Sequence, residues 1–473
     1  MPLKHTLRLP GLQVKRRQDV DMTSGNIIKH IITFAFPLLL GNLFQQMYNT
    51  VDTWVVGNYV GNNAFSAVGA VTPIINMLIG SFMGFSSGAG VVISQYYGAG
   101  QYNTVQDAVH TSIVLTFILS ILFTITGLVL TPILIGVINM HQDAVGEAST
   151  YLKIYFSGLI GLMLYNMGSG ILRAVGDSRK PFYFLVICAV LNTLLDLVFV
   201  LVFKMGVEGV ALATVVSQFI SAILVVLELL RTKSCIKLQI RRLKIHPAIF
   251  KKILSIGTPA ALQMAITAFS NVFVQSYITH FDLGMPSPDY MSGWTSYLKI
   301  DQLLFLPMQS IALASTTFVG QNLGKGQVAR ARKGVTYSIL MALSATAIMM
   351  IPVMVFAPHI VSFLNRKPEV IAHGTMFLHW LTPFYLLCCF NQIYAGALRG
   401  AGDSQAPMII MVTSFVGFRQ LYLFCMSRIY NEIIPIAMSY PAGWILCSLL
   451  CFIYYHRVRL DKHRVVETPP EQA

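Results

Sequence analysis

One phrase occurs twice in this chain, and its spacing limits the possible folds more than any other feature. Gly-Ile-Leu-Arg-Ala-Val-Gly-Asp-Ser covers residues 170–178, and Gly-Ala-Leu-Arg-Gly-Ala-Gly-Asp-Ser covers residues 396–404, so the two acids lie 226 residues apart, at 177 and 403. The same offset maps Gln95 onto Gln321 and Pro132 onto Pro358. A single long repeat indicates one duplicated unit, whereas solenoids repeat every few tens of residues.

The composition places this duplicated unit in a lipid bilayer. Only 11% of the 473 residues are charged and 55% are hydrophobic, against roughly 25% charged residues in a soluble domain. Between Asp52 and Asp107 there is no Asp, Glu, Lys or Arg, which leaves room for two crossings of about 20 residues each. We therefore predict an all-α polytopic membrane protein.

The apolar segments between Gly, Pro and charged residues predict twelve transmembrane helices. They start near Ile27, Ala64, Val105, Ala148, Pro181, Val207, Phe250, Gly293, Val328, Val370, Pro407 and Glu432. Each repeat holds an even number of helices, so the two six-helix bundles should be related by a pseudo-two-fold axis along the membrane normal. The predicted parts are an N-terminal bundle at 1–230, a basic cytoplasmic linker at 231–250, and a C-terminal bundle with a basic tail at 251–473.

The net charge of +14 follows from the orientation in the membrane. Most basic residues lie in the two tails and in the loops after even-numbered helices, which predicts that both termini are cytoplasmic. The exceptions on the opposite side are Lys153, Lys204, Arg366, Lys367 and Arg428. Because topology accounts for the charge, we expect no nucleic-acid partner. The basic linker is predicted to be a solvated segment that anchors the orientation, with contact to lipid headgroups as the alternative; membrane lipids are expected partners of the chain.

Prolines interrupt the first and seventh predicted helices at matching places, Pro37 and Pro259. Proline removes a backbone donor and kinks a helix, and in a membrane bundle neighbouring helices can satisfy the freed carbonyl. Both prolines are predicted hinges.

A serine in the second predicted helix offers an enzymatic alternative. Gly84-Phe-Ser86-Ser-Gly88 matches the Gly-x-Ser-x-Gly nucleophile pattern, but that motif needs a strand-to-helix turn and a matched base. An intramembrane hydrolase is therefore a remote alternative, and we expect the chain not to be an enzyme.

Acids inside apolar spans cost about 3 kcal/mol each to insert, so they are candidate functional residues. Asp52 ends the first span, and Asp196 lies four residues after Asn192 on one face of the fifth. Tyr48 precedes Asp52 by one turn. The repeat places Val274 and Tyr422 at the positions equivalent to the two acids, so the acids occur in one half only, as a single cation site requires.

Three further charges lie inside spans of the second half, namely Lys299, Asp301 and Arg419. They fit either a neutralising charge network or the lining of a cavity. The sequence leaves both interpretations open.

At these residues the chain resembles the multidrug and toxic compound extrusion (MATE) family, in its DinF-like prokaryotic branch. The resemblance covers roughly residues 22–456 and rests on the two Leu-Arg-x-x-Gly-Asp-Ser phrases and on three further segments. These are Phe-Ala-Phe-Pro at 34–37, Gln-Gln-Met-Tyr-Asn-Thr-Val-Asp at 45–52, and Gly-Gln-Asn-Leu-Gly at 320–324.

The resemblance implies a multidrug exporter that moves cationic or amphipathic compounds outward in exchange for sodium ions or protons by alternating access, with no other cofactor. It implies a multi-pass protein of the prokaryotic plasma membrane, acting as a monomer. The family's N-lobe cation site looks similar to Tyr48, Asp52, Asn192, Asp196 and Thr214, with Asn166 a weaker match. Some relatives carry acids in the seventh and tenth helices instead. This chain has Gln263 near the first of those positions and the uncharged residues 388–392 around the second, so the resemblance does not imply a cation site in the second half.

The nearest rival function is a lipid-linked oligosaccharide flippase of the same superfamily. A flippase holds an anionic pyrophosphate and should line its cavity with several basic residues, and Lys299 and Arg419 are the two that the sequence places inside predicted spans.

Overall fold

The computed structural model describes residues 20–137, 142–283, 289–430 and 432–466, and nearly all of them are helical. The helices of the first half are α1 (Ile27–Val55), α2 (Asn62–Gly98), α3 (Tyr102–Val137), α4 (Gln142–Ser157), α5 (Leu159–Ala174), α6 (Arg179–Leu197) and α7 (Val207–Arg231). Those of the second half are α8 (Pro247–Leu283), α9 (Tyr290–Gly324), α10 (Val328–Val355), α11 (Ala357–Leu364), α12 (Pro368–Leu381), α13 (Tyr385–Ala401), α14 (Gln405–Val412), α15 (Arg419–Ile429), α16 (Ile433–Ala437) and α17 (Ser439–Arg457).

The predicted all-α membrane fold is confirmed. Within the described part of the chain, eleven helical segments are long and apolar enough to cross a membrane, and α4 with α5, bent by 48°, forms a twelfth. Several predicted spans are broken helices. The tenth comprises α12 and α13 joined by a short 3₁₀ turn, and the eleventh comprises α14 and α15 joined by a π-helical turn.

The repeated phrase forms the same helix-to-helix joint in both halves. Gly176 (φ +87°) ends α5 and Gly402 (φ +99°) ends α13 in the left-handed conformation that favours glycine. The amides of Asp177 and Asp403 then donate back to Leu172 and to Leu398, at 3.1 and 3.0 Å. The repeat is therefore a Schellman-type helix end followed at once by a new helix.

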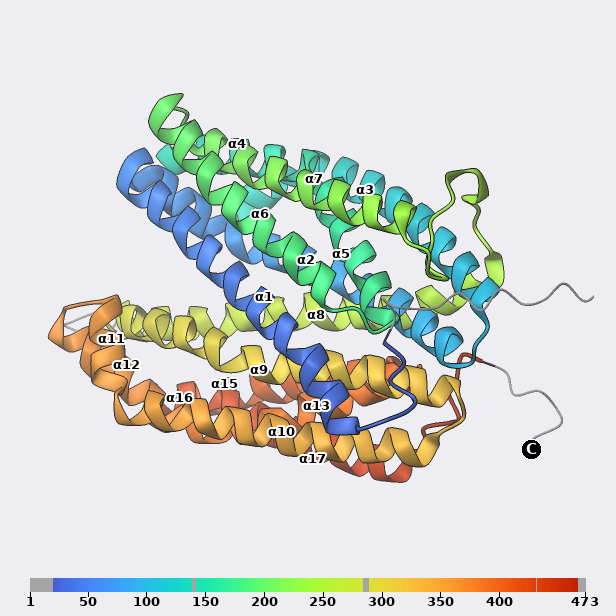
Figure 1. Cartoon of the computed structure of the whole chain (residues 1–473). Helices are drawn as coiled ribbons and strands as arrows, with labels where there is room; N and C mark the ends of the chain where they lie inside the picture. Colours follow the sequence, from blue (N-terminus) through green and yellow to red (C-terminus); the bar gives the residue numbers. More distant parts are fainter. Residues whose placement is uncertain (1–19, 138–141, 284–288, 431, 467–473) are drawn as a thin grey trace, which may run out of the picture.

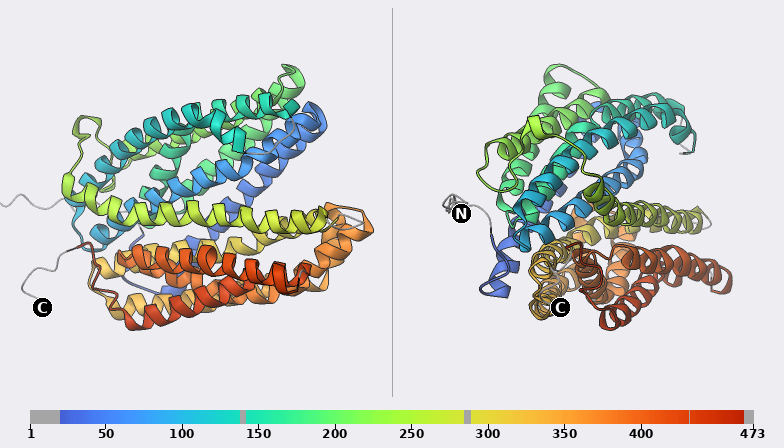
Figure 2. Two further views of the ribbon diagram at one scale, coloured as in Figure 1. Left: turned by 180° about the vertical axis from the view of Figure 1, so that it is seen from behind. Right: turned by 90° about the vertical axis from the view of Figure 1, so that its right-hand side faces the viewer.

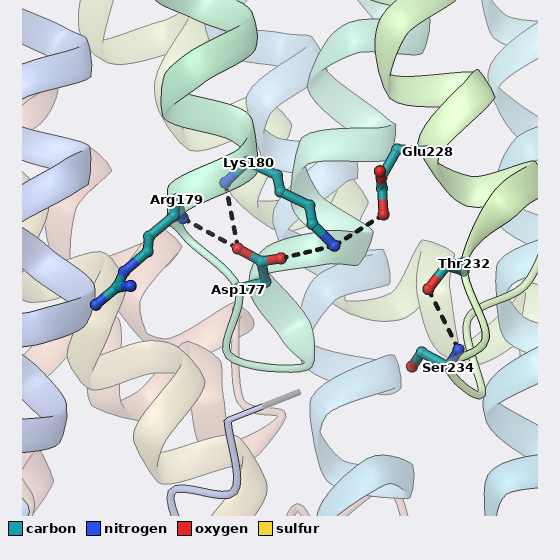
Figure 3. A network of polar contacts seen from close by, with 6 residues as sticks. All are labelled: Asp177, Arg179, Lys180, Glu228, Thr232 and Ser234. Atoms are coloured by element: carbon teal, nitrogen blue, oxygen red, sulfur yellow. Dashed lines mark hydrogen bonds and ion pairs between the residues drawn. The ribbon is translucent and has the colours of Figure 1, made fainter. Parts of the chain in front are cut away.

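The acid of each joint caps the next helix and ties it to a neighbour. Asp177 Oδ1 accepts from the amides of Arg179 and Lys180 at 3.1 and 3.2 Å, and Lys180 Nζ bridges Asp177 to Glu228 of α7 at 3.4 and 2.8 Å (Figure 3). In the segment that follows α7, the amide of Ser234 donates to Thr232 Oγ1 at 3.2 Å. In the second half Asp403 accepts from the amide of Ala406 at 3.1 Å and, in place of an ion pair with lysine, from the hydroxyl of Tyr454 at 2.7 Å.

The helices of the two halves form two groups that lie side by side and diverge toward one end of the molecule (Figures 1 and 2). Two helices link the groups. The start of α1 contributes Ile31 and Phe34 to the core of the second half, whereas its later Gly41 packs on Phe182 of α6. In the same manner the start of α8 contributes Ile253 and Ile256 to the core of the first half.

The contact between α2 and α8 depends on glycines. A side chain at Gly84 would strike the backbone of Ala261 at 2.3 Å, and one at Gly88 would strike Gly257 at 2.6 Å. This is the close helix packing that small residues permit in membranes.

The predicted division of the chain into a first bundle, a linker and a second bundle, with boundaries at 230 and 250, stays a prediction.

Both described chain ends, near residues 20 and 466, lie at the end of the molecule where the two groups of helices converge, which we call the terminal end; the opposite end is the far end (Figure 1). At the terminal end α2 and α9 touch through equivalent residues. A side chain at Gly98 would overlap the carbonyl of Gln321 at 1.9 Å, and one at Gly324 would overlap that of Gln95 at 2.0 Å. The two halves are therefore closed against each other there.

Two equivalent glutamines join this closed end to the chain termini. Gln321 donates to the carbonyl of Ala174 at 2.9 Å and accepts from the amide of Met22 at 3.0 Å. Gln95 donates to the carbonyl of Gly400 at 2.9 Å and accepts from the amide of Val465 at 2.7 Å. We call these two sets of bonds the N-terminal and the C-terminal clamp.

Candidate functional site

Two acidic side chains meet near the far end of the first half. Asp52 lies in the last turn of α1 and Asp196 in the last turn of α6, and their carboxyl groups are within interaction range of each other. A π-helical turn follows each helix, at residues 56–60 and 198–202, and the two turns are in contact. Such wide turns are frequent at functional sites, because they redirect side chains within a helix.

Four oxygen atoms at this place are buried and accept no hydrogen bond from the described residues. They are Asp52 Oδ1, Asn192 Oδ1 and both carboxylate oxygens of Asp196. Asn192 and Asp196 are fully buried. By the standard of small-molecule transfer, each polar atom left unpaired in an apolar surrounding costs on the order of several kcal/mol. The cluster is therefore suited to a proton or to a hard cation that prefers oxygen ligands.

Neutral groups complete the cluster. Asn192 Nδ2 donates to Thr214 Oγ1 of α7 at 3.4 Å, and that hydroxyl donates to the carbonyl of Val210 at 3.1 Å. Tyr48 lies one turn before Asp52 and interacts electrostatically with it. The structure thus brings five of the six predicted residues together, and their role as cation ligands stays a prediction.

The sixth residue, Asn166, forms its hydrogen bonds away from the acid pair. Asn166 lies on α5, where its amide donates to the carbonyl of Leu162 in its own helix at 2.8 Å, and its backbone carbonyl accepts from Ser86 at 2.7 Å. Among the described residues no recorded contact joins Asn166 to the acid pair. Its assignment to the site stays a prediction without geometric support.

Sequence reasoning missed Tyr151, which adjoins the acids, and two residues beyond it, Tyr155 and Gln218. Tyr151 of α4 interacts electrostatically with both Asp52 and Asp196. Tyr155 stacks on Tyr151 with ring centroids 6.3 Å apart and planes 15° from parallel, and it shares a hydrogen bond with Gln218 of α7. Their spacing of four residues on a helix face was the available signal.

The three charges predicted in the second half do not form a network. Lys299 is exposed, Asp301 accepts hydrogen bonds from Tyr297 and Tyr385, and the buried Arg419 donates to Ser270 and Asn271 at 2.6 and 2.9 Å. None of the ion pairs found in the described residues joins any two of them. The network interpretation is wrong for this structure, and the cavity interpretation remains for Asp301.

Gln263 lies apart from Asp301. Its amide contacts Met411 Sδ at 2.8 Å, and its oxygen accepts from Arg399 at 3.4 Å. Arg399 and its equivalent Arg173 belong to the repeated phrase and were not counted as intramembrane cations from the sequence. Arg173 lines a cavity between the halves with a volume of only about 20 Å³, which has room for one water molecule.

The two prolines lie inside continuous helices, Pro37 in α1 and Pro259 in α8. The serine of the nucleophile pattern also lies within a continuous helix, and its hydroxyl donates to a backbone carbonyl. Ser86 therefore lacks the strand-to-helix turn that a nucleophile elbow requires.

Comparison with known proteins decides the family. The family model described as MatE matches residues 37–198 and again residues 259–422, so each half matches it once. The chain belongs to the MATE family. MATE proteins are membrane transporters of small molecules and not enzymes, which confirms two of the sequence predictions.

Relatives of this MATE transporter match it along nearly its whole length. The "Probable multidrug resistance protein YpnP" of Bacillus subtilis is 26% identical over 92% of this chain and 96% of its own. The "Probable multidrug resistance protein NorM" of Thermotoga maritima is 25% identical over 93% and 94%. A solved structure described as the outward-facing conformation of a multidrug resistance MATE family transporter superposes with a TM-score of 0.86 at 22% identity, over 92% of this chain and 96% of the other.

Proposed function

We propose that this MATE transporter exports cationic or amphipathic compounds from a prokaryotic cell in exchange for sodium ions or protons. The observation that carries the proposal is the cluster of buried, unpaired oxygen atoms at Asp52, Asn192 and Asp196. Two carboxylates that approach each other without a counter-charge repel, and a bound sodium ion or proton removes that repulsion. Names of relatives such as the multidrug resistance protein of Bacillus subtilis support the substrate class.

The arrangement of the halves supports alternating access as the transport mechanism. The terminal end is closed by the contacts of Gly98 and Gly324 and by both clamps, while the helices diverge toward the far end (Figure 1). With the termini in the cytoplasm, as the basic loops predict, the closed terminal end is the cytoplasmic end. Binding of an ion at Asp52 and Asp196 can shift the balance between this state and the opposite one only if the two states bind it with different affinity.

The flippase alternative is less well supported. Arg173 and Arg399 add two basic residues to those considered from the sequence, but the cavity beside Arg173 holds about one water molecule and Arg399 is bonded to Gln263. Neither place accommodates a pyrophosphate in this structure.

The proposal is tested with purified protein in vesicles, following accumulation of ethidium under separately imposed sodium and proton gradients. We expect one gradient to drive transport in the wild type, and Asp52→Asn and Asp196→Asn to abolish the gradient-driven part. Asp107→Asn, which alters an acid at the opposite end of the first half beside His246, serves as the matched control and should retain transport. Wild-type rates in both site variants, present at normal levels, would refute the ion site.

A further inference from the structure

The second half contains a cavity that is separate from the acid pair of the first half. It has a volume of about 250 Å³ and lies between α8, α9 and α17. Its walls include one acid, two aromatic rings and three side-chain amides: Asp301, Trp294, Tyr440, Asn271, Gln275 and Gln302. Drug-sized ligands occupy pockets of roughly 300–1,000 Å³, so this cavity suits a small ligand or the head group of a larger one.

Asp301 places a carboxyl group in the wall of the cavity. It accepts hydrogen bonds from the hydroxyls of Tyr297, at 3.4 Å, and of Tyr385. Lys299 points to the exposed side of α9. No ion pair of the described residues includes Asp301. An intramembrane carboxylate is costly unless a positive charge accompanies it.

Among the described residues, Arg419 is a cation in contact with the cavity walls, and it is engaged by other partners. Arg419 donates to Ser270 and to Asn271, and its guanidinium lies 4.9 Å from the ring centroid of Tyr440. These contacts orient Asn271 and Tyr440 as walls of the cavity. The charge of Arg419 therefore stabilises the walls and leaves Asp301 available for a ligand.

Two largely buried aromatic residues, Trp294 and Tyr440, line the cavity together with the acid. Trp294 and Tyr440 pack edge to face with centroids 5.4 Å apart, and Trp294 also packs on Tyr297 at 4.8 Å. Ring faces of tryptophan and tyrosine attract organic cations, and quaternary ammonium groups are commonly recognised in this way. A carboxylate beside two such rings combines charge with an apolar surface that an alkylated amine can fill.

The cavity also adjoins a contact between the two halves. Gln302 lines it and accepts from Gln46 Nε2 of α1 at 2.5 Å. Gln46 precedes Asp52 by six residues, or about 9 Å along a helix. A ligand that moves Gln302 therefore acts directly on the helix that carries the first acid of the pair.

We propose that this cavity binds the amine or quaternary ammonium group of the exported compound, with Asp301 as its counter-charge and Trp294 and Tyr440 as its aromatic walls. The acid pair in the first half then binds the coupling ion, and the two cations occupy different halves. This assignment rests on the proposed export function for its biological meaning, but the binding itself can be measured without transport.

The test measures binding of radiolabelled tetraethylammonium to the purified protein. We expect Asp301→Asn, which keeps an acceptor for both tyrosines, to weaken binding about tenfold or more, a change equivalent to about 1.4 kcal/mol. Lys299→Gln, two residues away on the exposed face, is the matched control and should bind as the wild type does. Failure of the wild type to bind, or equal binding by Asp301→Asn and Lys299→Gln, would overturn the proposal.

A second pair of variants covers the case in which Asp301→Asn does not fold. Tyr440→Phe keeps the ring and should bind normally, whereas Tyr440→Leu removes it and should weaken binding several-fold. Equal binding by these two variants would also overturn the cation site. Asp52→Asn can abolish gradient-driven transport while the Asp301 and Tyr440 variants bind tetraethylammonium as the wild type does. In that case the proposed function stands and only this assignment fails.

Discussion

Charge and geometry at the acid pair come from different residues. Asp52 and Asp196 supply the negative charge, whereas Asn192 and Thr214 hold the carboxylate-bearing helix α6 against α7 through one hydrogen bond. Sodium needs neutral oxygen ligands as well as charge, while a proton needs one acceptor only. The neutral residues therefore distinguish the two coupling ions.

We predict that Thr214→Val changes sodium coupling more than proton coupling. The substitution keeps the shape but removes a hydroxyl, and the loss of one ligand or hydrogen bond costs about 1 kcal/mol, or roughly a fivefold rise in the sodium concentration for half-maximal transport. Thr124→Val removes a hydroxyl that bonds the carbonyl of Phe156 at 3.0 Å and serves as the control. An unchanged sodium dependence would remove Thr214 from the ligand set.

The sequence predicted the acids of this site but not their full surroundings. Asp52 and Asp196 were identifiable because acids are rare in apolar spans. The spacing of Tyr151 and Tyr155 places them on one helix face, but it does not separate site residues from the aromatic residues that serve as ordinary packing material in a membrane protein. Lys299 lies inside a span as predicted and is exposed, and its position in the span alone could not show which side of the helix it faces.

At the scale of single helices, the prediction of a hinge at Pro37 now has a structural setting. Residues before Pro37 pack in the core of the second half, and Gly41 after it packs on α6. A bend at Pro37 would let these two parts move with different halves. We expect Pro37→Ala to insert and fold normally but to slow turnover several-fold, as shown by initial transport rates at saturating substrate.

The equivalent proline of the second half gives a parallel test. Pro259 lies in α8, which crosses between the cores in the opposite direction, so Pro259→Ala should have a similar effect if bending of both crossing helices drives the transition. A wild-type rate for well-expressed Pro37→Ala would show that the proline only shapes the helix.

The repeated joint gives a second prediction at this scale. Asp403→Ala removes the acceptor for the amide of Ala406 and for Tyr454, and loss of such a helix cap typically costs about 1 kcal/mol. We expect a lower midpoint of thermal unfolding for Asp403→Ala. Asp403→Asn, which keeps the amide acceptor, should recover much of the loss; equal loss in both variants would mean that the negative charge, and not the cap, matters.

For the whole molecule, the fold was more predictable than the site. The repeat and the apolar spans indicated the helices and the two bundles, because lipid leaves few alternatives for a backbone. The clamps could not be predicted. They join residues 147 to 370 positions apart, such as Met22 to Gln321, and no local pattern in the tails marks such a contact.

We predict that the double variant Gln95→Ala and Gln321→Ala opens the terminal end more often. Four hydrogen bonds are lost, each worth about 1 kcal/mol. Ser94, which is 1% exposed beside the contact between the halves, can be replaced by Cys and its rate of alkylation measured in a Cys235→Ser background. A faster rate is expected in the double variant, and Gln101→Ala, which alters an exposed glutamine, should leave it unchanged.

The orientation of the whole chain is tested by thiol labelling in intact cells. The basic loops predict that Cys235 reacts with an impermeant reagent only from the cytoplasm, whereas Glu369→Cys, at the far end, reacts from outside. Labelling of both positions from one side would contradict the topology.

The clamps also set the order in which the transporter can be completed during synthesis. The segment at Met22 leaves the ribosome early, yet its partner Gln321 follows 299 residues later, which at about 5–20 residues per second takes roughly 15–60 seconds. The partner of Gln95 is Val465, 370 residues further along the chain. The newly made first half must therefore remain in the membrane with its terminal end unsealed, and the barrier between the two sides is finished only when the last helix has been inserted.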